Sequence, residues 1–494
     1  MAKSLNVLFV SSEVEPFAKT GGLADVSGAL PQTIRHLNHE VRIMMPRYGN
    51  INERKAKLHE MIRLRDIDVP LGTRAYPASV KSSFISSNHH KVQVYFLDNA
   101  TLFGRSGLYV HPDTKKDYPD NDERFIFFSR GVLEVLKRLG WKPDVVHCND
   151  WQTGLVPAYL KTVYRNDPFY KDTKTVFTIH NMAYQGIFPK SSFQKTLLPP
   201  ELFSERGIEA YGKMNLLKAG LVFADAITTV SERYAQEIRS SDEYGCGLQD
   251  ILNKRKNDLH GIMNGIDYGI WNPAVDEMIP HRYDVKTLDV KVENKKALLG
   301  KRELPFNPKT PVIGMISRLA DQKGFDLLGA IIDDMMKLDV QLVVLGTGEK
   351  KYHDMLEAAE KRYPDKLSVD LSFNDALAHL IEAGTDIFLM PSRYEPCGLN
   401  QLYSLKYGTV PIVRATGGLD DSIEEVDASS GTGTGFKFKK YESAELLKTV
   451  QRAVHLYADQ ALWRKIMKNG MSKDFSWEAS ARKYLHIYRS LAKR

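Results

Sequence analysis

The sequence predicts an α/β protein with two Rossmann-like domains that face each other across a cleft. Three observations predict this fold class. Short apolar strands alternate with amphipathic helical segments along the whole chain, which is typical of parallel sheets with right-handed crossovers. The chain has 494 residues, too many for one ordinary core. A Thr-Gly-Gly-Leu motif occurs at 20–23 and again at 416–419, once in each half.

The first predicted strand, at 7–10, leads through a loop with Lys19, Gly21 and Gly22 into a helix predicted over 25–37. Adjacent glycines let a ligand approach the backbone, the start of a helix presents N–H groups, and the lysine adds a positive charge. The loop therefore suits an anionic group such as a diphosphate. The alternative is a plain tight turn with a solvated lysine.

Further strands of this half are predicted at 40–45, 92–97, within 143–151, and at 175–179, 226–230 and 261–267, the last with a turn, and a helix at 125–139. Two of these strands end in polar side chains, at the sheet edge where ligands bind in open α/β folds. Asp150 follows one of them and His180 the other. A lone histidine is more often structural, but its place at a strand end favours a functional role.

Asp120-Asn121-Asp122 has the spacing of an Asp-x-Asp metal site. It also directly precedes the helix predicted at 125–139, where carboxylates are well placed as N-terminal caps. A metal is also less necessary if lysine and arginine side chains balance the charge of a bound phosphate. We therefore expect caps here and no metal.

The irregular, proline-containing stretch at 271–281 indicates a domain boundary. We predict an N-terminal domain over 1–267 and a C-terminal domain over 268–474. The remaining residues, 475–494, are predicted to form a helix that packs back on the first domain. Its apolar stripe recurs at helical spacing and consists of Trp477, Ala481, Tyr484, Tyr488 and Leu491.

In the second half, strands predicted at 312–316, 342–345, 386–390 and 410–413 each run into a loop with chemically distinctive residues. The first loop carries the cations Arg318 and Lys323, and the second is Gly346-Thr347-Gly348. The last two loops contain Glu395, Cys397, Gly398 and Leu399, and then Thr416, Gly417 and Gly418. Two glycine-rich anion loops, one in each half, predict one phosphate-bearing ligand held between two similar domains.

Composition excludes several classes of protein. Hydrophobic residues make up 43% and charged residues 26%, as in soluble globular proteins. No apolar run reaches the roughly 18 residues of a membrane helix and no signal peptide is recognisable, so we expect a cytoplasmic protein without a membrane partner. The net charge of +7 is spread thinly, which disfavours nucleic acid as a partner. Cys148, Cys246 and Cys397 form no Cys-x-x-Cys pair, so we expect reduced thiols.

Taken together, the stretches at 19–26, 180–186, 395–399 and 416–419 closely resemble the bacterial glycogen synthases and plant starch synthases, and the resemblance covers nearly the whole chain. It implies the GT-B architecture of two Rossmann-like domains. It also implies a hexosyltransferase that elongates an α-1,4-glucan from ADP-glucose with retention of configuration, without a metal or other cofactor.

The resemblance further implies roles for single residues. Lys19, Gly21 and Gly22 would hold the sugar nucleotide near its glucosyl phosphate, and Arg318 and Lys323 would neutralise the departing diphosphate. Other positions would contact the donor or the acceptor. These are Glu395 with Cys397, Gly398 and Leu399 at the donor sugar, Thr416, Gly417 and Gly418 at the phosphate, Phe373 at the adenine, and Asp150, His180 and Asn264 on the sugar and acceptor side.

One position departs from the wider glycosyltransferase clan. A second glutamate follows the first there, whereas Tyr403 occupies that position in this sequence. The change leaves open how the ribose hydroxyls are held.

The chemistry of glucosyl transfer agrees with the charged residues. Cleavage of a glucosyl phosphate places extra negative charge on the diphosphate, and cations fixed beside it lower the barrier. A hydrolase would need a pair of carboxylates that the sequence does not provide. Three alternatives stay open, namely a synthase that uses UDP-glucose, a glucan phosphorylase with pyridoxal phosphate, and a non-catalytic glucan-binding protein. Front-face and double-displacement routes to retention are also open.

Overall fold

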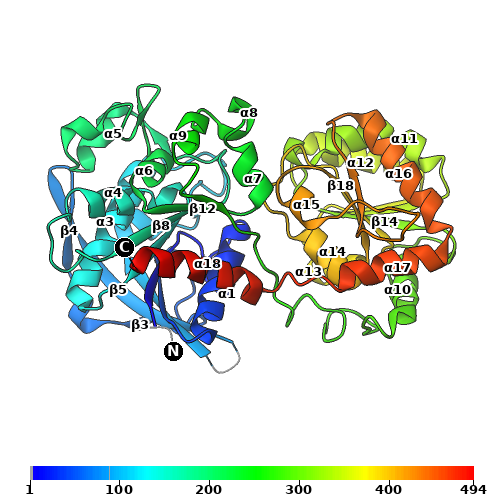
Figure 1. Ribbon diagram of the computed structural model, residues 1–494, viewed down its shortest axis with the longest axis horizontal. Helices are drawn as coiled ribbons and strands as arrows, with labels where there is room; N and C mark the ends of the chain where they lie inside the picture. The colour runs from blue at the N-terminus through cyan, green and yellow to red at the C-terminus, as the bar shows by residue number, and fades with distance from the viewer. Residues whose placement is uncertain (1–3, 88–89, 494) are drawn as a thin grey trace. The chain divides into compact units, whose positions relative to one another are not determined.

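The computed structural model describes residues 4–87 and 90–493 and divides the chain into two compact units (Figure 1). The N-terminal unit comprises Met1–Val230, Ala235–Gly265 and Trp477–Arg494, and the C-terminal unit comprises Ser231–Tyr234 and Ile266–Ser476. The main boundaries therefore fall close to the positions 267 and 474 expected from the sequence. No helix among the described residues is long and apolar enough to cross a membrane.

The sheet of the N-terminal unit is parallel through most of its width. Its order is β13-β12-β8-β7-β1-β2-β6-β5-β3. The parallel strands are β1 (Asn6–Val10), β2 (Glu40–Pro46), β6 (His90–Asp98), β7 (Val145–Asn149), β8 (Lys174–Ile179), β12 (Ala226–Thr229) and β13 (Leu259–Gly261). The order reverses direction between β1 and β7, and ligands of open α/β sheets bind at such a switch point.

One edge of this sheet is antiparallel, which the sequence analysis did not foresee. β5 (Arg74–Ser87) pairs with β6, and β3 (His59–Glu60) and β4 (Ile67–Leu71) pair with β5. A separate three-stranded sheet is formed by β9 (Ile187–Phe188), β10 (Glu209–Ala210) and β11 (Lys213–Asn215). These short or edge strands carry little hydrophobic periodicity, so pairing between segments creates them.

Helices of the N-terminal unit connect its strands. They are α1 (Gly22–His36), α2 (Ala100–Phe103), α3 (Asn121–Leu139), α4 (Leu155–Lys161), α5 (Lys190–Lys195), α6 (Leu216–Phe223), α8 (Asp242–Gly245) and α9 (Gln249–Lys254). A further short helix, α7 (Glu232–Glu237), begins at the boundary near residue 231.

The strand predicted at 261–267 is wrong in its position. The observed strand β13 ends at Gly261, and the amide of Ile262 donates the last hydrogen bond of the ladder to the carbonyl of Thr229, at 2.8 Å. Because β12 itself ends at Thr229, the residues that follow have no strand to pair with.

The N-terminal capping role predicted for the carboxylates of Asp120 and Asp122 is also wrong in detail. Asp120 occupies the N-cap position of α3, but its side chain makes no capping hydrogen bond. Its carboxylate instead accepts a hydrogen bond from Arg105 Nη1 at 2.6 Å, and Asp122 pairs with Lys195 at 2.8 Å. Tertiary ion pairs, rather than the helix start, use these carboxylates.

The terminal helix α18 (Trp477–Ala492) packs on the N-terminal unit, as predicted. Its stripe of buried side chains includes Tyr484 and Tyr488. The Tyr488 hydroxyl lies 2.6 Å from Nδ1 of the buried His147 on β7, and Ser480 Oγ donates to the carbonyl of Met263 at 2.6 Å. The buried side chains of α18 therefore belong to the same core as those of β1 and β7.

The C-terminal unit contains one six-stranded parallel sheet in the order β16-β15-β14-β17-β18-β19. Its strands are β14 (Val312–Ile316), β15 (Gln341–Leu345), β16 (Leu367–Asp370), β17 (Ile387–Met390), β18 (Val410–Arg414) and β19 (Phe436–Phe438). This is the strand order of dinucleotide-binding folds, with its switch point between β14 and β17. The two Rossmann-like domains that the sequence predicts are confirmed.

Apolar clusters cover both faces of this sheet. Ile313 and Val344 belong to one cluster, whereas their sequence neighbours Val312 and Val343 belong to the other. The helices are α10 (Lys291–Lys301), α11 (Phe325–Met336), α12 (Lys350–Arg362), α13 (Asp375–Gly384), α14 (Asn400–Tyr407), α15 (Gly417–Ser422), α16 (Ser443–Tyr457) and α17 (Gln460–Met471). The fully buried sheet explains its continuous apolar strands.

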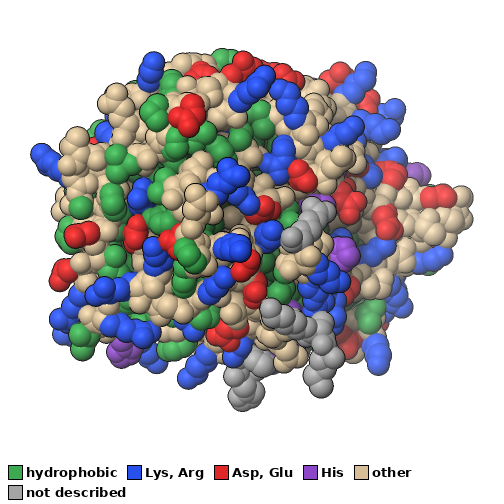
Figure 2. All heavy atoms as spheres, turned by 60° about the vertical axis from the view of Figure 1, so that its left-hand side comes forward, with side chains coloured by type: hydrophobic (Ala, Val, Ile, Leu, Met, Phe, Trp, Pro, Cys, Tyr) green, Lys and Arg blue, Asp and Glu red, His purple; other side chains and the backbone are tan. Residues whose placement is uncertain are grey.

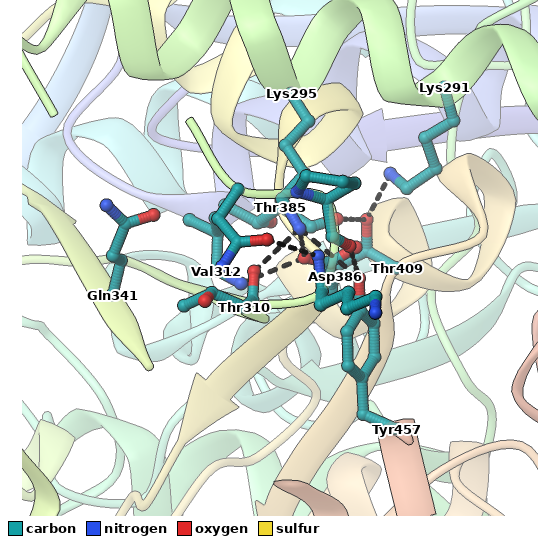
Figure 3. A network of polar contacts seen from close by, with 12 residues as sticks. Lys291, Lys295, Thr310, Val312, Gln341, Thr385, Asp386, Thr409 and Tyr457 are labelled. Carbon is teal, nitrogen blue, oxygen red and sulfur yellow. Dashed lines mark hydrogen bonds and ion pairs between the residues drawn. The ribbon is translucent and has the colours of Figure 1, made fainter. Parts of the chain in front are cut away.

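A buried polar network lies at the start of the strands, opposite the edge where ligands bind (Figure 3). Lys295 Nζ donates to Asp386 Oδ2 at 2.7 Å and to the Thr310 carbonyl at 2.8 Å. Asp386 in turn accepts the Val312 amide at 2.8 Å, and Lys291 Nζ donates to Thr409 Oγ1 at 2.8 Å. The network ties α10 to β14, β17 and β18 and so supports the sheet from below.

Charge is mixed on the surface. Figure 2 shows Lys and Arg side chains interspersed with Asp and Glu over the face in view. The small net charge of the sequence therefore forms no continuous patch of one sign on that face.

Candidate active site

The loop after β1 is organised by Glu13, a residue that the sequence analysis missed. Glu13 is only 4% exposed. Its carboxylate accepts the amides of Thr20 and Gly21, the Thr20 hydroxyl at 2.6 Å and the Tyr109 hydroxyl at 2.8 Å. Glu13 therefore fixes the loop from beneath. The signal in the sequence was a carboxylate placed directly after a strand and shortly before a glycine pair.

Neither packing nor backbone conformation within the protein requires glycine at Gly21 and Gly22 in this first loop. A Cβ added at Gly21 or Gly22 would find no protein atom within 4 Å. Gly21 has extended backbone with φ of −161°, which any residue adopts. Lys19 Nζ lies 2.6 Å from Asp25 Oδ1, and both side chains are partly exposed. The space above the loop is therefore open to a ligand at the N-terminus of α1.

Asp150 stands at the end of β7, beside the switch point of the N-terminal sheet. Its φ is +55°, an uncommon and strained conformation for a residue other than glycine. Oδ1 accepts the His180 amide at 2.7 Å. Burial raises the pKa of the Asp150 carboxyl to about 7, against the stabilising amides of His180 and Asn181. The site thus holds a carboxyl that exchanges its proton near neutral pH.

His180 at the end of β8 is neutral. Asn149 Nδ2 donates to the carbonyl of Val10 at 3.0 Å, so its Oδ1 faces His180 Nε2, also at 3.0 Å. Nε2 must then carry the proton, and Nδ1 is left as an acceptor. Burial lowers the pKa of His180 to about 3. This histidine can accept a hydrogen bond from a hydroxyl but does not carry a positive charge at neutral pH.

Asn264 follows β13 and is 6% exposed. Among the described residues, its buried Oδ1 has no hydrogen-bond partner. An unpaired buried amide oxygen is costly, and a hydroxyl-bearing ligand would relieve that cost. Asn264 joins Asp150 and His180 as a polar group of the N-terminal unit that is suited to sugar hydroxyls.

The switch point of the C-terminal sheet brings Lys323 and Glu395 together. Lys323 Nζ lies 2.6 Å from Glu395 Oε2, which also accepts the Ser392 hydroxyl at 3.0 Å. The Glu395 side chain is 7% exposed. A Cβ at Gly324, where φ is +78°, would lie 2.1 Å from the Pro391 carbonyl oxygen. Glycine is therefore required there for the two loops to meet.

Arg318 follows β14 at the same edge and is exposed. Among the residues that the structure describes, no ion pair or side-chain hydrogen bond of Arg318 is present. Next to it, Asn400 Nδ2 donates to the Ile316 carbonyl at 3.1 Å and links the start of α14 to the end of β14. Arg318 is thus a cation available to a ligand at the switch point.

The second glycine motif differs from the first in its role. A Cβ at Gly417 would lie 2.0 Å from the Glu395 carbonyl oxygen, and one at Gly418 2.0 Å from that of Cys397. The Gly418 amide already donates to the carbonyls of Glu395 and Pro396, both at 3.1 Å. The Gly418 N–H, which we expected to face phosphate, is thus already hydrogen-bonded within the protein. These glycines allow α15 to pack tightly against the Glu395 loop.

Residues next to Glu395 and Gly417 also help to fix the shape of the loops after β17 and β18. Gly398 has φ of +72°, and Gln401 Nε2 donates to the carbonyls of Cys397 and Gly398 at 3.0 and 3.1 Å. Leu399 occupies the N-cap position of α14 and Thr416 that of α15. The stretch from Glu395 to Leu399 is thereby held in one shape.

Two aromatic residues of this unit have opposite environments. Phe373, between β16 and α13, is 91% exposed and can stack on a flat ligand. Tyr403 on α14 instead stacks on Trp271, with ring centroids 3.9 Å apart, and Trp271 stacks on His379 at 3.8 Å. Tyr403, which replaces the second glutamate of the wider glycosyltransferase clan, therefore packs against the chain segment around Trp271.

No cluster of three or more metal-ligating His, Cys, Asp or Glu side chains occurs within residues 4–87 and 90–493.

Comparison with known proteins places this arrangement among glucan-synthesising enzymes. A family model described as the starch synthase catalytic domain matches residues 6–254, and one described as glycosyl transferases group 1 matches residues 300–470. Proteins named glycogen synthase from Desulforamulus reducens and Koribacter versatilis are 45% and 46% identical to the chain, which covers 99% and 98% of their lengths and is itself covered to 99% and 98%.

Solved structures agree. The catalytic domain of starch synthase IV from Arabidopsis thaliana, bound to ADP and acarbose, is 31% identical, with a TM-score of 0.89 and complete coverage of both chains. Sucrose-phosphate synthase from Thermosynechococcus elongatus, at 17% identity and a TM-score of 0.59 over 99% of both chains, shares the fold.

Proposed function

The chain belongs to the family of bacterial glycogen synthases and plant starch synthases, which are hexosyltransferases, and from that premise we propose its donor, its acceptor and the work of its residues. The proposed reaction transfers glucose from ADP-glucose to the non-reducing end of an α-1,4-glucan with retention of configuration. The observation that carries the proposal is the group of Arg318, Lys323 and Glu395 at the switch point of a nucleotide-binding sheet.

The two cations stabilise the leaving group. The Lys323 ammonium has three N–H donors and needs only one for Glu395, so it can also contact a phosphate oxygen. Arg318 adds a second fixed positive charge. Charge that develops on the diphosphate is then met by groups that need not reorganise during the reaction.

Glu395 has a different task. Its carboxylate is buried beside the cations and is held by Lys323 and Ser392. A carboxylate fixed in this way accepts hydrogen bonds from the hydroxyls of the donor glucose and orients that ring. The tight packing at Gly417 and Gly418 keeps its loop in place.

The N-terminal unit supplies groups for the sugar and the acceptor. The Asp150 carboxyl, the acceptor Nδ1 of neutral His180 and the unpaired Oδ1 of Asn264 complement hydroxyl groups. Lys19 and the open space above Gly21 and Gly22 suit the glucosyl phosphate.

ADP-glucose is the donor that the comparisons favour, because the starch synthase IV structure contains ADP. The exposed ring of Phe373 would stack on the base, a contact that tolerates any base. We propose further that the enzyme works in the cytoplasm and without a metal or other cofactor, since basic side chains neutralise the phosphates.

Substitution of Arg318 tests the leaving-group role cleanly, because its exposed side chain supports no other described residue. We expect Arg318→Ala to lower incorporation of radiolabelled glucose into glycogen by on the order of a hundredfold, the typical effect of removing one such group. The unfolding temperature should stay unchanged. Lys337→Ala, at a lysine whose side chain is 75% exposed on the far end of α11, is the matched control. Normal turnover in Arg318→Ala would refute the assignment.

The donor is tested by competition between ADP-glucose and UDP-glucose in the same incorporation assay. Preference for UDP-glucose would replace the proposed donor. Glucose transfer only from glucose 1-phosphate, with a pyridoxal phosphate absorbance band, would identify a phosphorylase. Glycogen binding without incorporation from either nucleotide would identify a binding protein.

A further inference from the structure

Tyr211 is displayed on the surface of the N-terminal unit in a conformation that costs stability. It lies in the two-residue turn between β10 and β11, is 82% exposed and has φ of +53°, followed by Gly212 at +75°. Turns of this kind favour asparagine or glycine at both positions. A large aromatic residue held at positive φ and facing solvent indicates a function outside the fold itself.

The ring of Tyr211 is held in one orientation despite its exposure. A Cβ added at Gly247 would lie 2.8 Å from Tyr211 Oη and 2.9 Å from Cε2. Gly247 itself has φ of +83° and follows Cys246, at +49°. The hydroxyl end of the ring therefore lies beside the backbone between α8 and α9. Most of the ring is open to solvent.

Hydrogen bonds connect the hairpin that carries Tyr211, and the turn beside its ring, to the His180 loop. The buried Gln185 donates from Nε2 to the Cys246 carbonyl at 2.9 Å, and its Oε1 accepts Asn215 Nδ2 at 2.7 Å. The amide of Leu217 donates back to the Gln185 carbonyl at 3.0 Å. The hairpin, the turn at Gly247 and the loop that carries His180 therefore form one hydrogen-bonded assembly, and Gln185 is its centre.

The surroundings of Tyr211 are polar rather than apolar. The carboxylate of Glu209 accepts the Gly212 amide at 2.6 Å, and Lys213 is exposed. A second exposed aromatic residue, Tyr184 at 55%, lies on the His180 loop. A large continuous apolar patch would mark a protein interface. A single supported ring among polar groups instead matches a glucose unit, whose C–H face is apolar and whose edge carries hydroxyls.

We propose that Tyr211 is a stacking platform for a glucose ring of the acceptor α-glucan, separate from the residues at the reacting bond. The inference rests on the proposed function, because that function supplies the glucan. A platform on the same unit as His180 strengthens the binding of long chains. It also gives a role to a tyrosine in a turn that asparagine would suit better.

Tyr211→Asn tests the platform, because asparagine suits the turn and removes the ring. We expect the unfolding temperature to stay equal or rise, while the dissociation constant for glycogen, measured by retardation in glycogen-containing native gels without donor, increases about five- to tenfold. The KM for glycogen should rise in parallel. Tyr211→Trp should retain binding. Phe84→Ala, at a 52% exposed aromatic on β5, is the matched control and should leave retardation unchanged.

The outcomes separate this inference from the proposed function. Unchanged retardation and KM in Tyr211→Asn, in an enzyme that incorporates glucose, would overturn the platform alone. A loss of retardation equal in Phe84→Ala and Tyr211→Asn would also overturn it, since the effect would not be specific to this ring. Retardation that depends on Tyr211 in a protein that transfers no glucose would support the platform and refute the proposed function.

Discussion

At the scale of single residues, the environment of a side chain decides its chemistry. Asp150 and His180 are ordinary acid and base types, yet burial moves the pKa of the first up to about 7 and that of the second down to about 3. At pH 7 His180 is therefore neutral, and Asp150 is divided about equally between its protonated and ionised forms. They act as hydrogen-bonding groups for hydroxyls rather than as a fixed ion pair.

The raised pKa of Asp150 predicts a pH-dependent stability. The carboxyl has a pKa of about 7 in the folded protein against an ordinary 3.8, so the folded state binds its proton more tightly. Its contribution is therefore favourable at low pH and is lost as pH rises between these two values. Asp150→Asn should gain stability relative to the parent over this range, on the order of a few kcal/mol by pH 8.

Chemical unfolding at several pH values between 4 and 8 measures this difference. Glu277→Gln, at a side chain that is 90% exposed and near only an arginine, provides the control and should show a flat difference. A flat difference for Asp150→Asn as well would contradict the burial of its charge. Glucose incorporation should fall in this variant because the carboxyl at the sheet edge is changed.

At the scale of elements, the two Thr-Gly-Gly-Leu motifs show that identical sequence can serve different purposes. At the start of α1, Gly21 and Gly22 leave open space. At the start of α15, Gly417 and Gly418 are filled by the backbone of the Glu395 loop. The motif at 20–23 leaves space for a ligand, whereas the motif at 416–419 is packed against the protein's own backbone.

This contrast predicts opposite results for a matched pair of variants. Gly22→Ala should leave the unfolding temperature equal or slightly higher, because alanine favours a helix, and should lower turnover about tenfold or more by crowding the ligand. Gly417→Ala should destabilise the C-terminal unit by about 2 kcal/mol or more, since the new methyl meets a carbonyl at positive φ. Calorimetry and the incorporation assay compare them. Equal stability losses in both variants would show that the motifs share one role.

At the scale of the whole molecule, each unit has its own core, and α18 belongs to the first although it ends the chain. Its buried residues close a core that starts at β1. Deletion of 477–494 should therefore remove apolar burial worth on the order of 10 kcal/mol from the N-terminal unit alone.

Differential scanning calorimetry should show the transition of the N-terminal unit lost or greatly lowered by this deletion, with that of the C-terminal unit preserved. Tyr488→Phe is a graded companion, because it keeps the packing and removes only the hydroxyl that contacts His147. Its expected cost is about 1–3 kcal/mol. Loss of both transitions in the deletion variant would show that the units do not unfold separately.

Much of the fold and of the site was predictable because its signals are local. Strand ends are recognisable from apolar runs that stop at polar residues, so Asp150, His180, Arg318, Lys323 and Glu395 could be placed at sheet edges without a structure. The antiparallel edge at β5, the bounds of the short strand β13 and the hydrogen-bond partners of Glu13 were not predictable. Each depends on a partner from a distant segment.

The sequence by itself determined the succession of parallel strands and helices in two units and the residue types at the strand ends, because periodicity and turn chemistry act over a few residues. Only the tertiary structure decided which groups are paired, buried or open. It put Glu13 beneath one glycine loop, Glu395 against the other, and a neutral histidine beside an aspartate whose pKa is raised by burial. Those outcomes depend on distances between segments far apart in the chain, and desolvation and hydrogen bonding follow those distances.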